Sequence, residues 1–361
     1  MTKRLFINGA AGRIGRGLTY EVHKSLFSNL ELVGLNDPMG IDFAIESYKA
    51  NDSVHGRYDW KIEKENDNLL VIDGIRRVAF FSERETSKIP FQDLGINILL
   101  EGSGFYGDPK VKDKSRKLLA EDNQSRVFLN YGIESVVQTY PAKTADASII
   151  MGVNHLTYDP EKHKVISNAS CTTKALALPL QVLINNGIEV EVLSMDTTHA
   201  ATATQKVLES LGQIITHSTG AAKATGLVIP TLEGKMTGMS YRVPTLDGSF
   251  ANLYFVATSK NELNSEIVND MFREASQHPQ YESRIGVFEG EDAGTFDIVG
   301  RRENSVVITS KTSLLPLSFA PEGRKAYLMT VISGYDNELG SVVDPVLLAE
   351  HIAEKFLKLQ I

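Results

Sequence analysis

A glycine-rich segment near the N-terminus constrains the fold of this chain more than any other feature. It reads Gly9-Ala10-Ala11-Gly12-Arg13-Ile14-Gly15 and lies between the apolar stretch Arg4–Asn8 and a segment in which Leu18, Val22 and Leu26 recur at helical spacing. Glycine lets the backbone turn tightly, and the N-terminus of a helix offers N–H groups and a positive dipole end to phosphates. The segment therefore predicts a dinucleotide-binding strand–loop–helix unit. The alternative is a glycine-rich turn of another α/β fold.

An acidic residue supports the dinucleotide prediction. The second predicted strand, Leu30–Leu35, leads to Asn36-Asp37-Pro38. A carboxylate at this place in such a unit accepts hydrogen bonds from the adenine-ribose hydroxyls and repels a 2′-phosphate. Asp37 therefore favours NAD as the cofactor, with NADP the less favoured alternative.

Short apolar strands alternate with helical patterns through the first half of the chain. This alternation is typical of a mostly parallel sheet with helices on both faces. We therefore predict a doubly wound, Rossmann-type dinucleotide-binding domain of the α/β class over residues 1–170. Its further predicted elements are strands at Ile96–Leu100, Val127–Leu129 and Ser148–Val153, and a helix-compatible segment at Asp113–Ala120.

The pattern changes after residue 170. Cys171–Asn185 is predicted to be a helix that stops at Asn186-Gly187, and longer strands with turn residues between them follow. We predict an α+β catalytic domain with a largely antiparallel sheet over residues 171–340. Residues 341–361 are predicted to return to the first domain through the amphipathic helix Leu347–Leu359. The predicted strands of the second domain are Glu189–Asp196, Leu253–Thr258, Val306–Ser310 and Tyr327–Ser333.

Composition excludes several classes of protein. The 361 residues include one cysteine, Cys171, which rules out an internal disulfide framework and a multi-cysteine zinc site, and we expect no metal. The net charge of −8 disfavours nucleic acid as a partner. No apolar run approaches the roughly 20 residues of a membrane helix. Residues 1–4 pass directly into a strand without a signal peptide, so we expect a cytoplasmic protein.

Two later segments carry candidate catalytic groups. Cys171 lies in Ser167–Thr173 at the predicted start of a helix, where the dipole stabilises a thiolate and the N–H groups can stabilise an oxyanion. His199 follows a predicted strand and is a candidate base for that thiol. The alternatives are a buried, unreactive cysteine and a histidine with a packing role. Spacing alone does not establish that the two residues meet.

Taken together, these segments resemble the glyceraldehyde-3-phosphate dehydrogenase family over essentially the whole chain. The sequence SNASCTT at Ser167–Thr173 is similar to the active-site signature of that family. The other matching segments, in family order, are Met151–His155, His199–Gln205 (HAATATQ), Ser218–Lys223 (STGAAK), Arg242–Pro244 and Tyr335–Glu338 (YDNE).

The resemblance implies a reaction and a role for each matching residue. Cys171 would be the nucleophile and His199 its base. The aldehyde would form a thiohemiacetal on sulfur, hydride transfer to NAD would leave a thioester, and inorganic phosphate would release an acyl phosphate. The implied cofactor-binding residues are Gly9, Gly12, Arg13, Ile14, Asp37, Ser103, Gly104 and Asn337. Thr202 and Arg242 would hold the phosphate of the substrate, and Ser170, Thr172, Thr219 and Gly220 would hold the attacking phosphate.

The chain also departs from the family pattern. The glycine loop is one residue longer than usual, and in that respect is similar to semialdehyde dehydrogenases. Lys174 replaces the usual asparagine. It is either a solvated lysine or a cation that lowers the pKa of the thiol. The segment between Lys206 and Ser218 is shorter than usual and lacks an arginine, which leaves Lys206 or Lys223 to replace it. We expect a homo-oligomer, either a tetramer or a dimer.

The leading hypothesis is NAD-dependent, phosphorylating oxidation of glyceraldehyde 3-phosphate. Alternatives within this chemistry are another phosphorylated aldehyde, such as erythrose 4-phosphate, and water in place of phosphate as the acceptor. Further alternatives are a reductive semialdehyde dehydrogenase, favoured only by the glycine loop, and a non-catalytic homologue. The presence of both Cys171 and His199 argues against the last.

Overall fold

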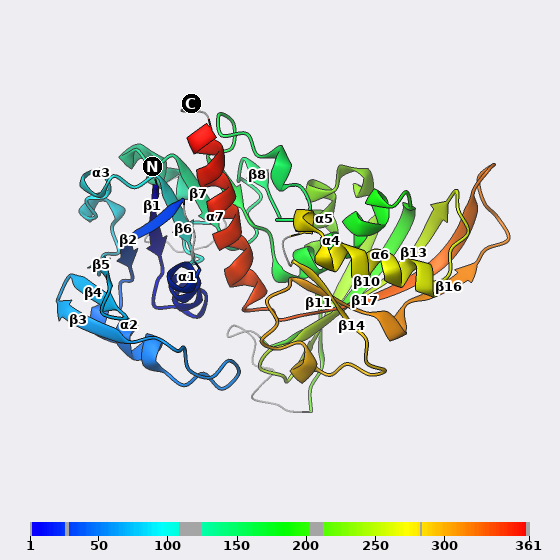
Figure 1. Cartoon of the computed structure of the whole chain (residues 1–361), viewed down its shortest axis with the longest axis horizontal. Coiled ribbons are helices and arrows are strands. Elements are labelled where there is room, and N and C mark those ends of the chain that lie inside the picture. The colour runs from blue at the N-terminus through cyan, green and yellow to red at the C-terminus, as the bar shows by residue number, and fades with distance from the viewer. Residues whose placement is uncertain (1, 26–28, 108–123, 202–211, 282–283, 359–361) are drawn as a thin grey trace. The chain divides into compact units, whose positions relative to one another are not determined.

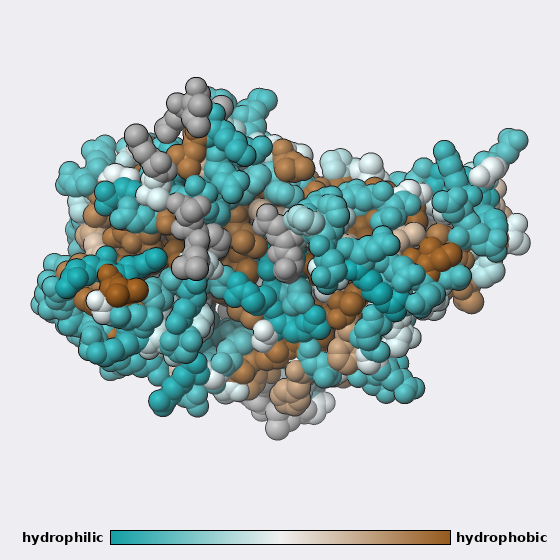
Figure 2. All heavy atoms as spheres, viewed as in Figure 1, coloured by the Kyte–Doolittle hydropathy of each residue, from teal (hydrophilic) through white to brown (hydrophobic). Residues whose placement is uncertain are grey.

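The computed structural model describes all residues except 1, 26–28, 108–123, 202–211, 282–283 and 359–361. The chain divides into two compact units. Unit 1 comprises residues 1–149, 155–169 and 341–361, and unit 2 comprises residues 150–154 and 170–340. No helix among the described residues is long and apolar enough to cross a membrane. On the face drawn in Figure 2, most of the exposed residues are hydrophilic, with hydrophobic residues among them at several places.

Unit 1 is built on a sheet in the strand order β3-β4-β5-β2-β1-β6-β7-β9-β8 (Figure 1). The strands from β5 to β8 are parallel, and β3 and β4 pair antiparallel at one edge. The elements are β1 (Lys3–Asn8), α1 (Arg13–Lys24), β2 (Leu30–Asn36), α2 (Ile41–Lys49), β3 (Ile62–Asn66), β4 (Leu69–Ile72), β5 (Arg76–Phe81), α3 (Phe91–Leu94), β6 (Ile98–Glu101), β7 (Ser135–Gln138), β8 (Ala147–Ser148), β9 (Val165–Ser167) and α7 (Gly340–Lys358).

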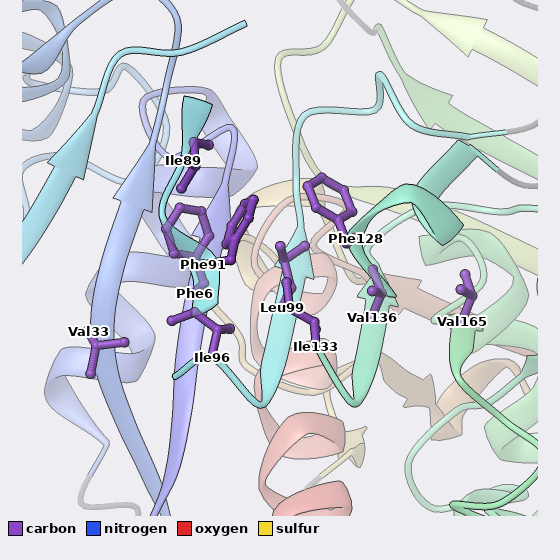
Figure 3. Close-up of a cluster of buried hydrophobic side chains, with 10 residues drawn as sticks. All are labelled: Phe6, Val33, Ile89, Phe91, Ile96, Leu99, Phe128, Ile133, Val136 and Val165. Atoms are coloured by element: carbon purple, nitrogen blue, oxygen red, sulfur yellow. The ribbon is translucent and has the colours of Figure 1, made fainter. Parts of the chain in front are cut away.

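The core of unit 1 includes a cluster of apolar side chains from neighbouring strands and loops (Figure 3). The ring of Phe91 meets those of Phe6 and Phe128 edge-on, with centroids 5.0 and 5.9 Å apart. These rings are at most 1% exposed. Their burial fixes the sheet whose strand ends carry the predicted cofactor-binding residues. The cluster comprises Phe6, Val33, Ile89, Phe91, Ile96, Leu99, Phe128, Ile133, Val136 and Val165.

Unit 2 is built on a mainly antiparallel sheet in the order β11-β12-β10-β13-β17-β15-β14, with β16 paired to β17. Among the described strands, the pairs β10–β12 and β14–β15 are parallel and the others are antiparallel. The elements are α4 (Cys171–Asn185), β10 (Glu189–Ala200), β11 (Ile215–Ser218), α5 (Ala221–Val228), β12 (Met236–Val243), β13 (Ser249–Ser259), α6 (Ser265–Gln277), β14 (Ile285–Phe288), β15 (Ser305–Ile308), β16 (Ser313–Pro316) and β17 (Lys325–Tyr335).

Side chains alternate between the two faces of this second sheet, as the pleat of a strand requires. Along β13, Leu253 and Phe255 are buried on the face against which α4 packs, whereas Tyr254 on the opposite face is 43% exposed. Helices α5 and α6 pack against α4. The helix-covered face therefore forms the core of unit 2.

The predicted fold class is confirmed, and the helix Cys171–Asn185 begins and ends as predicted. Two predicted strands are wrong. Val127–Leu129 lies in a 3₁₀ helix, Gln124–Tyr131, in which Phe128 is buried and its two neighbours are only half-buried. Ser148–Val153 is extended only at its first residue, because the chain then turns at Gly152, whose φ is +80°. The segment Asp113–Ala120 lies outside the described residues.

Candidate active site

Cys171 is the first residue of α4 and follows a sharp turn. Ala169 adopts a left-handed backbone conformation with φ of +56°, which is uncommon for a residue with a side chain. The next residue, Ser170, caps the helix, because its Oγ accepts the Thr173 N–H at 3.1 Å. The turn between β9 and α4 therefore places the thiol at the positive end of a 15-residue helix.

His199 lies beside Cys171 in space, 28 residues further along the chain. It is near the end of β10, where alternation places its side chain on the same buried face as Met195 and Thr197. Its Nε2 is 3.5 Å from the Cys171 Sγ. The structure thus brings together the two candidate catalytic residues whose meeting the sequence left open.

Arg242 completes this cluster through the pairing of two strands. The parallel register of β10 and β12 sets Arg242 opposite His199. The Arg242 Nη1 lies 2.6 Å from the His199 Nδ1, and it donates to the Ala200 carbonyl at 3.0 Å. The same Nδ1 lies 2.8 Å from the Ala200 oxygen.

The tautomer of His199 decides what its Nε2 offers to the thiol. If Nδ1 carries the hydrogen and donates to the Ala200 carbonyl, the Nε2 lone pair faces the Cys171 Sγ and can accept a proton. If Arg242 donates to Nδ1, the hydrogen is on Nε2 and points at sulfur. The two arrangements are mutually exclusive, so Arg242 competes with the tautomer that acts as a base.

Burial and charge set the protonation of the pair. Burial, and then the Arg242 guanidinium, lower the pKa of His199 to about 4, so that the imidazole is neutral at pH 7. Burial also raises the pKa of the Cys171 thiol. The Thr172 hydroxyl, the Lys174 ammonium and Arg242 act in the opposite direction. The site therefore contains a neutral base, His199, beside the Cys171 thiol. Burial raises the pKa of that thiol, and the nearby cations lower it.

Tyr335, at the end of β17, is a residue whose role the sequence reasoning missed. Its hydroxyl lies between the hydroxyls of Thr172, at 3.0 Å, and Thr197, at 2.7 Å. Its ring meets the imidazole of His199 edge-on, with centroids 5.9 Å apart. Burial raises the pKa of Tyr335, so its hydroxyl stays protonated. Only the resemblance pointed to this residue, and nothing in the sequence pattern indicated its partners.

The residues predicted to hold the attacking phosphate lie at the N-termini of two helices. Ser170 and Thr172 flank Cys171, and both hydroxyls already bond within the protein. Gly220 is the N-cap of α5, which packs against α4, and the Thr219 Oγ1 accepts the Ala221 N–H at 3.1 Å. The N-terminus of a helix favours anions. Thr202, predicted to hold the substrate phosphate, lies outside the described residues.

Asn337 follows β17 and is held by β13 and the turn before it. The Ser249 hydroxyl donates to the Asn337 Oδ1 at 3.0 Å, and the Asn337 N–H donates to the Asp247 Oδ1 at 3.1 Å. Both its side chain and its backbone are therefore oriented within unit 2.

The glycine loop of unit 1 fits a dinucleotide. Gly9 has a φ of +78°, and a Cβ on Gly15 would lie 1.9 Å from the Gly9 carbonyl oxygen, so neither position tolerates a side chain. Gly12 is the N-cap of α1, which begins with Arg13 and Ile14, and as a glycine it contributes no capping side chain. This glycine backbone at a helix N-terminus matches what a pyrophosphate requires.

The carboxylate of Asp37 lies at the end of β2 and also supports the loop. Its Oδ2 accepts the Ala11 N–H at 2.9 Å, and its Oδ1 accepts the Met39 N–H at 3.0 Å. Both oxygens keep lone pairs that can accept from ribose hydroxyls. A carboxylate here fits NAD.

Glu101 lies near this glycine loop. Like that of Tyr335, its role was not indicated by the sequence pattern. It ends β6 and is fully buried. Its Oε1 accepts the Ser103 N–H at 2.8 Å, and its Oε2 accepts the Asn8 side-chain amide at 2.6 Å. Burial raises the pKa of this carboxyl to about 7. Glu101 thereby fixes the loop that contains the predicted cofactor-binding residues Ser103 and Gly104, the latter with φ of +67°.

Comparisons with known proteins agree with this geometry. Residues 3–109 match the family model described as glyceraldehyde 3-phosphate dehydrogenase, NAD binding domain, and residues 170–337 match its C-terminal domain. NAD is therefore the cofactor of unit 1.

Similar curated proteins cover almost the whole chain. A glyceraldehyde-3-phosphate dehydrogenase of Eremothecium gossypii is 35% identical over 97% of this chain and 99% of its own length. Proteins of that name from Saccharomyces cerevisiae and Chlamydia muridarum are 34% identical over 97% of this chain and 99% and 98% of their own lengths. With its fold, its thiol–imidazole pair and these relatives, the chain belongs to the glyceraldehyde-3-phosphate dehydrogenase family.

Proposed function

We propose that this protein is an NAD-dependent, phosphorylating glyceraldehyde-3-phosphate dehydrogenase. The observation that carries the proposal is the 3.5 Å contact between the Cys171 Sγ and the His199 Nε2 at the N-terminus of α4. This arrangement meets the requirements of nucleophilic catalysis on an aldehyde: a thiol, a neutral base and helix N–H groups.

In the first step, the sulfur of Cys171 attacks the aldehyde carbon and forms a C–S bond. The thiol proton moves to the Nε2 of His199. The carbonyl oxygen becomes an oxyanion, which the N–H of Cys171 at the start of α4 is positioned to stabilise. His199 returns this proton to the oxyanion, which gives the thiohemiacetal hydroxyl, and its free Nε2 accepts the hydroxyl proton when the thiohemiacetal is oxidised to a thioester. NAD, when bound, accepts the hydride.

Residues of the described loops would hold the cofactor. Gly9, Gly12, Arg13 and Ile14 would hold its pyrophosphate, and Asp37 its adenine ribose. Ser103 and Gly104 would border its ribose and phosphates. Asn337, oriented by Ser249, would bind the nicotinamide amide.

In the second step, inorganic phosphate attacks the thioester carbon and the Cys171 thiolate leaves. Ser170, Thr172, Thr219 and Gly220 would hold this phosphate at the two helix N-termini. Thr202 and Arg242 would hold the phosphate of the substrate. Lys223, exposed in the first turn of α5, supports a cationic contribution to the attacking-phosphate site.

The test is a matrix of aldehyde, cofactor and anion, followed by the absorbance of NADH. We expect NADH from glyceraldehyde 3-phosphate and NAD, dependent on phosphate or arsenate. Better turnover of erythrose 4-phosphate would reassign the substrate, and activity without an inorganic anion would indicate hydrolysis. Cys171→Ser should still bind NAD without turnover. No activity with any combination would refute the proposal.

We also propose a homo-oligomer that uses the face of the unit 2 sheet opposite α4. Val192, Val256 and Leu328 form one row across β10, β13 and β17, and Val192 and Leu328 are 54% and 41% exposed. An exposed apolar row of this kind is typical of an interface. Light scattering on wild type and Leu328→Asp should show a dimer or tetramer that the aspartate disrupts. A monomeric wild type would refute this.

The single thiol supports a cytoplasmic location, because a reducing compartment preserves Cys171 as a nucleophile.

A further inference from the structure

Lys174 is the fourth residue of α4, three positions after Cys171, and its side chain is buried. Its exposed fraction is 0%, and its Nζ atom is buried with the rest of the side chain. The solvated alternative considered from the sequence is therefore wrong. A lysine is almost never fully buried unless another group compensates its charge, so its place beside the candidate nucleophile needs a physical account.

The geometry of α4 directs Lys174 toward Cys171. Residues three positions apart lie on the same face of a helix, and side chains lean toward the helix N-terminus. We therefore expect the stem of Lys174 to lie over the turn that begins with Cys171. The buried ammonium lowers the pKa of the Cys171 thiol, and its effect is larger than that of Arg242.

Neither of the two other basic neighbours, His199 and Arg242, lowers the pKa of the thiol as much as Lys174 does. His199 is neutral at pH 7, because burial and Arg242 hold its pKa near 4. The Nη1 of Arg242 is directed at the His199 Nδ1 and the Ala200 carbonyl. A thiolate formed in this site is therefore stabilised by the Thr172 hydroxyl, by the helix N-terminus and, among the charged side chains, mainly by Lys174.

We propose that Lys174 is a positioning residue that acts through Cys171, because its buried ammonium stabilises the thiolate in a site where the imidazole stays neutral. The proposal rests on the proposed function only in that Cys171 is the nucleophile. It assigns to Lys174 an electrostatic role that nothing in the family resemblance supplies.

Alkylation by iodoacetamide tests this role without substrate or cofactor. The thiolate attacks the methylene carbon, an S–C bond forms and iodide leaves. The rate therefore follows the fraction of thiolate. Because Cys171 is the only cysteine, mass spectrometry of the intact chain follows this one reaction. The rate is measured from pH 6 to 11 for each variant.

We expect Lys174→Gln to move the pH profile of alkylation upward by about one unit, which slows alkylation at pH 7 by about tenfold. Lys174→Arg, which keeps the charge, should restore most of the reactivity. The matched control is Lys235→Gln, which removes the charge of another lysine of unit 2 whose Nζ donates to the Val190 carbonyl. It should keep the wild-type profile.

An unchanged profile in Lys174→Gln would overturn the proposal. So would an equal shift in Lys174→Arg, because packing rather than charge would then be responsible. If Lys174→Gln does not fold, NMR titration of the Lys174 ammonium in wild type and Cys171→Ser replaces it. By linkage, loss of the thiolate should lower the pKa of Lys174, and no change would refute the proposal. Because alkylation needs no aldehyde, its result is independent of the dehydrogenase assay.

Discussion

The contact between Arg242 and His199 shows how one residue controls the chemistry of another. Two positive charges cannot share this buried space at low cost, so the guanidinium opposes protonation of the imidazole. Together with burial, this charge makes His199 a weak base for the thiol proton. A phosphate that engaged Arg242 would offset its charge and strengthen that base.

Arg242→Gln should raise the pKa of His199 from about 4 toward its ordinary value of 6.5, because the nearest positive charge is removed. NMR titration of the ring, assigned by comparison with His199→Asn, measures the shift. Arg324→Gln serves as the control, because that arginine bonds Glu189 and Thr258 instead. A His199 pKa that stays near 4 in Arg242→Gln would show that burial alone lowers it.

Tyr335→Phe should lower the free energy of unfolding by about 1 to 2 kcal/mol, since two buried hydroxyls, those of Thr172 and Thr197, lose a partner. Urea unfolding measures this loss. Tyr254→Phe is the control, because Tyr254 is exposed on the opposite face of the same sheet. Equal stability of the two variants would contradict the bridging role of Tyr335.

At the scale of elements, α4 combines a strained turn, a cap and a segment that is buried on all sides. Ala169 accepts an unfavourable φ, and Ser170 then satisfies an N–H that the helix itself leaves without an acceptor. The helix is anchored by Leu176, Leu178 and Leu180, all of which are fully buried. The buried helix therefore holds in place the strained turn at Ala169, after which Cys171 presents its thiol.

Ser170→Ala should reduce the free energy of unfolding by about 1 kcal/mol, because the first turn of α4 loses its cap. Urea unfolding followed by circular dichroism measures the change. Ser170→Asp, which keeps a capping oxygen, should recover the stability. If alanine and aspartate behave alike at this position, the cap is not the source of the effect.

The sequence predicted the elements whose pattern is periodic and local. The strand–glycine loop–helix unit and the helix after Ser170 are confirmed because apolar spacing and capping residues determine them. The prediction of a strand at Val127–Leu129 was wrong, since three apolar residues in a row are compatible with both a strand and a 3₁₀ helix. The partners of Tyr335 and the burial of Lys174 depend on contacts between distant segments, which no local pattern encodes.

At the scale of the whole molecule, stability is linked to pH through Glu101. Burial raises the pKa of this carboxyl from 4.5 to about 7. Between these values the folded protein binds the proton more tightly than the unfolded chain does. The stabilising contribution of the protonated carboxyl is therefore complete below pH 4.5 and is lost as the pH rises to 7.

Glu101→Gln should remove this dependence, because an amide cannot ionise. The difference in unfolding free energy between wild type and variant should change by on the order of 3 kcal/mol between pH 4.5 and 7. Chemical denaturation across this range measures it. Glu31→Gln, at an exposed position of β2, is the matched control. Parallel pH profiles for wild type and Glu101→Gln would refute the assignment.

The sheet of unit 2 has a consequence for the motions of the site. Arg242, His199, Ser249 and Tyr335 come from β12, β10, β13 and β17, which are consecutive neighbours in the sheet. These four strands are hydrogen-bonded side by side, so they cannot separate without breaking several hydrogen bonds at once. Amide protons around these four residues should exchange with deuterium slowly and as a single cooperative group. We then expect these four residues to adjust during turnover by rotation of their side chains, while the strands that carry them keep their register.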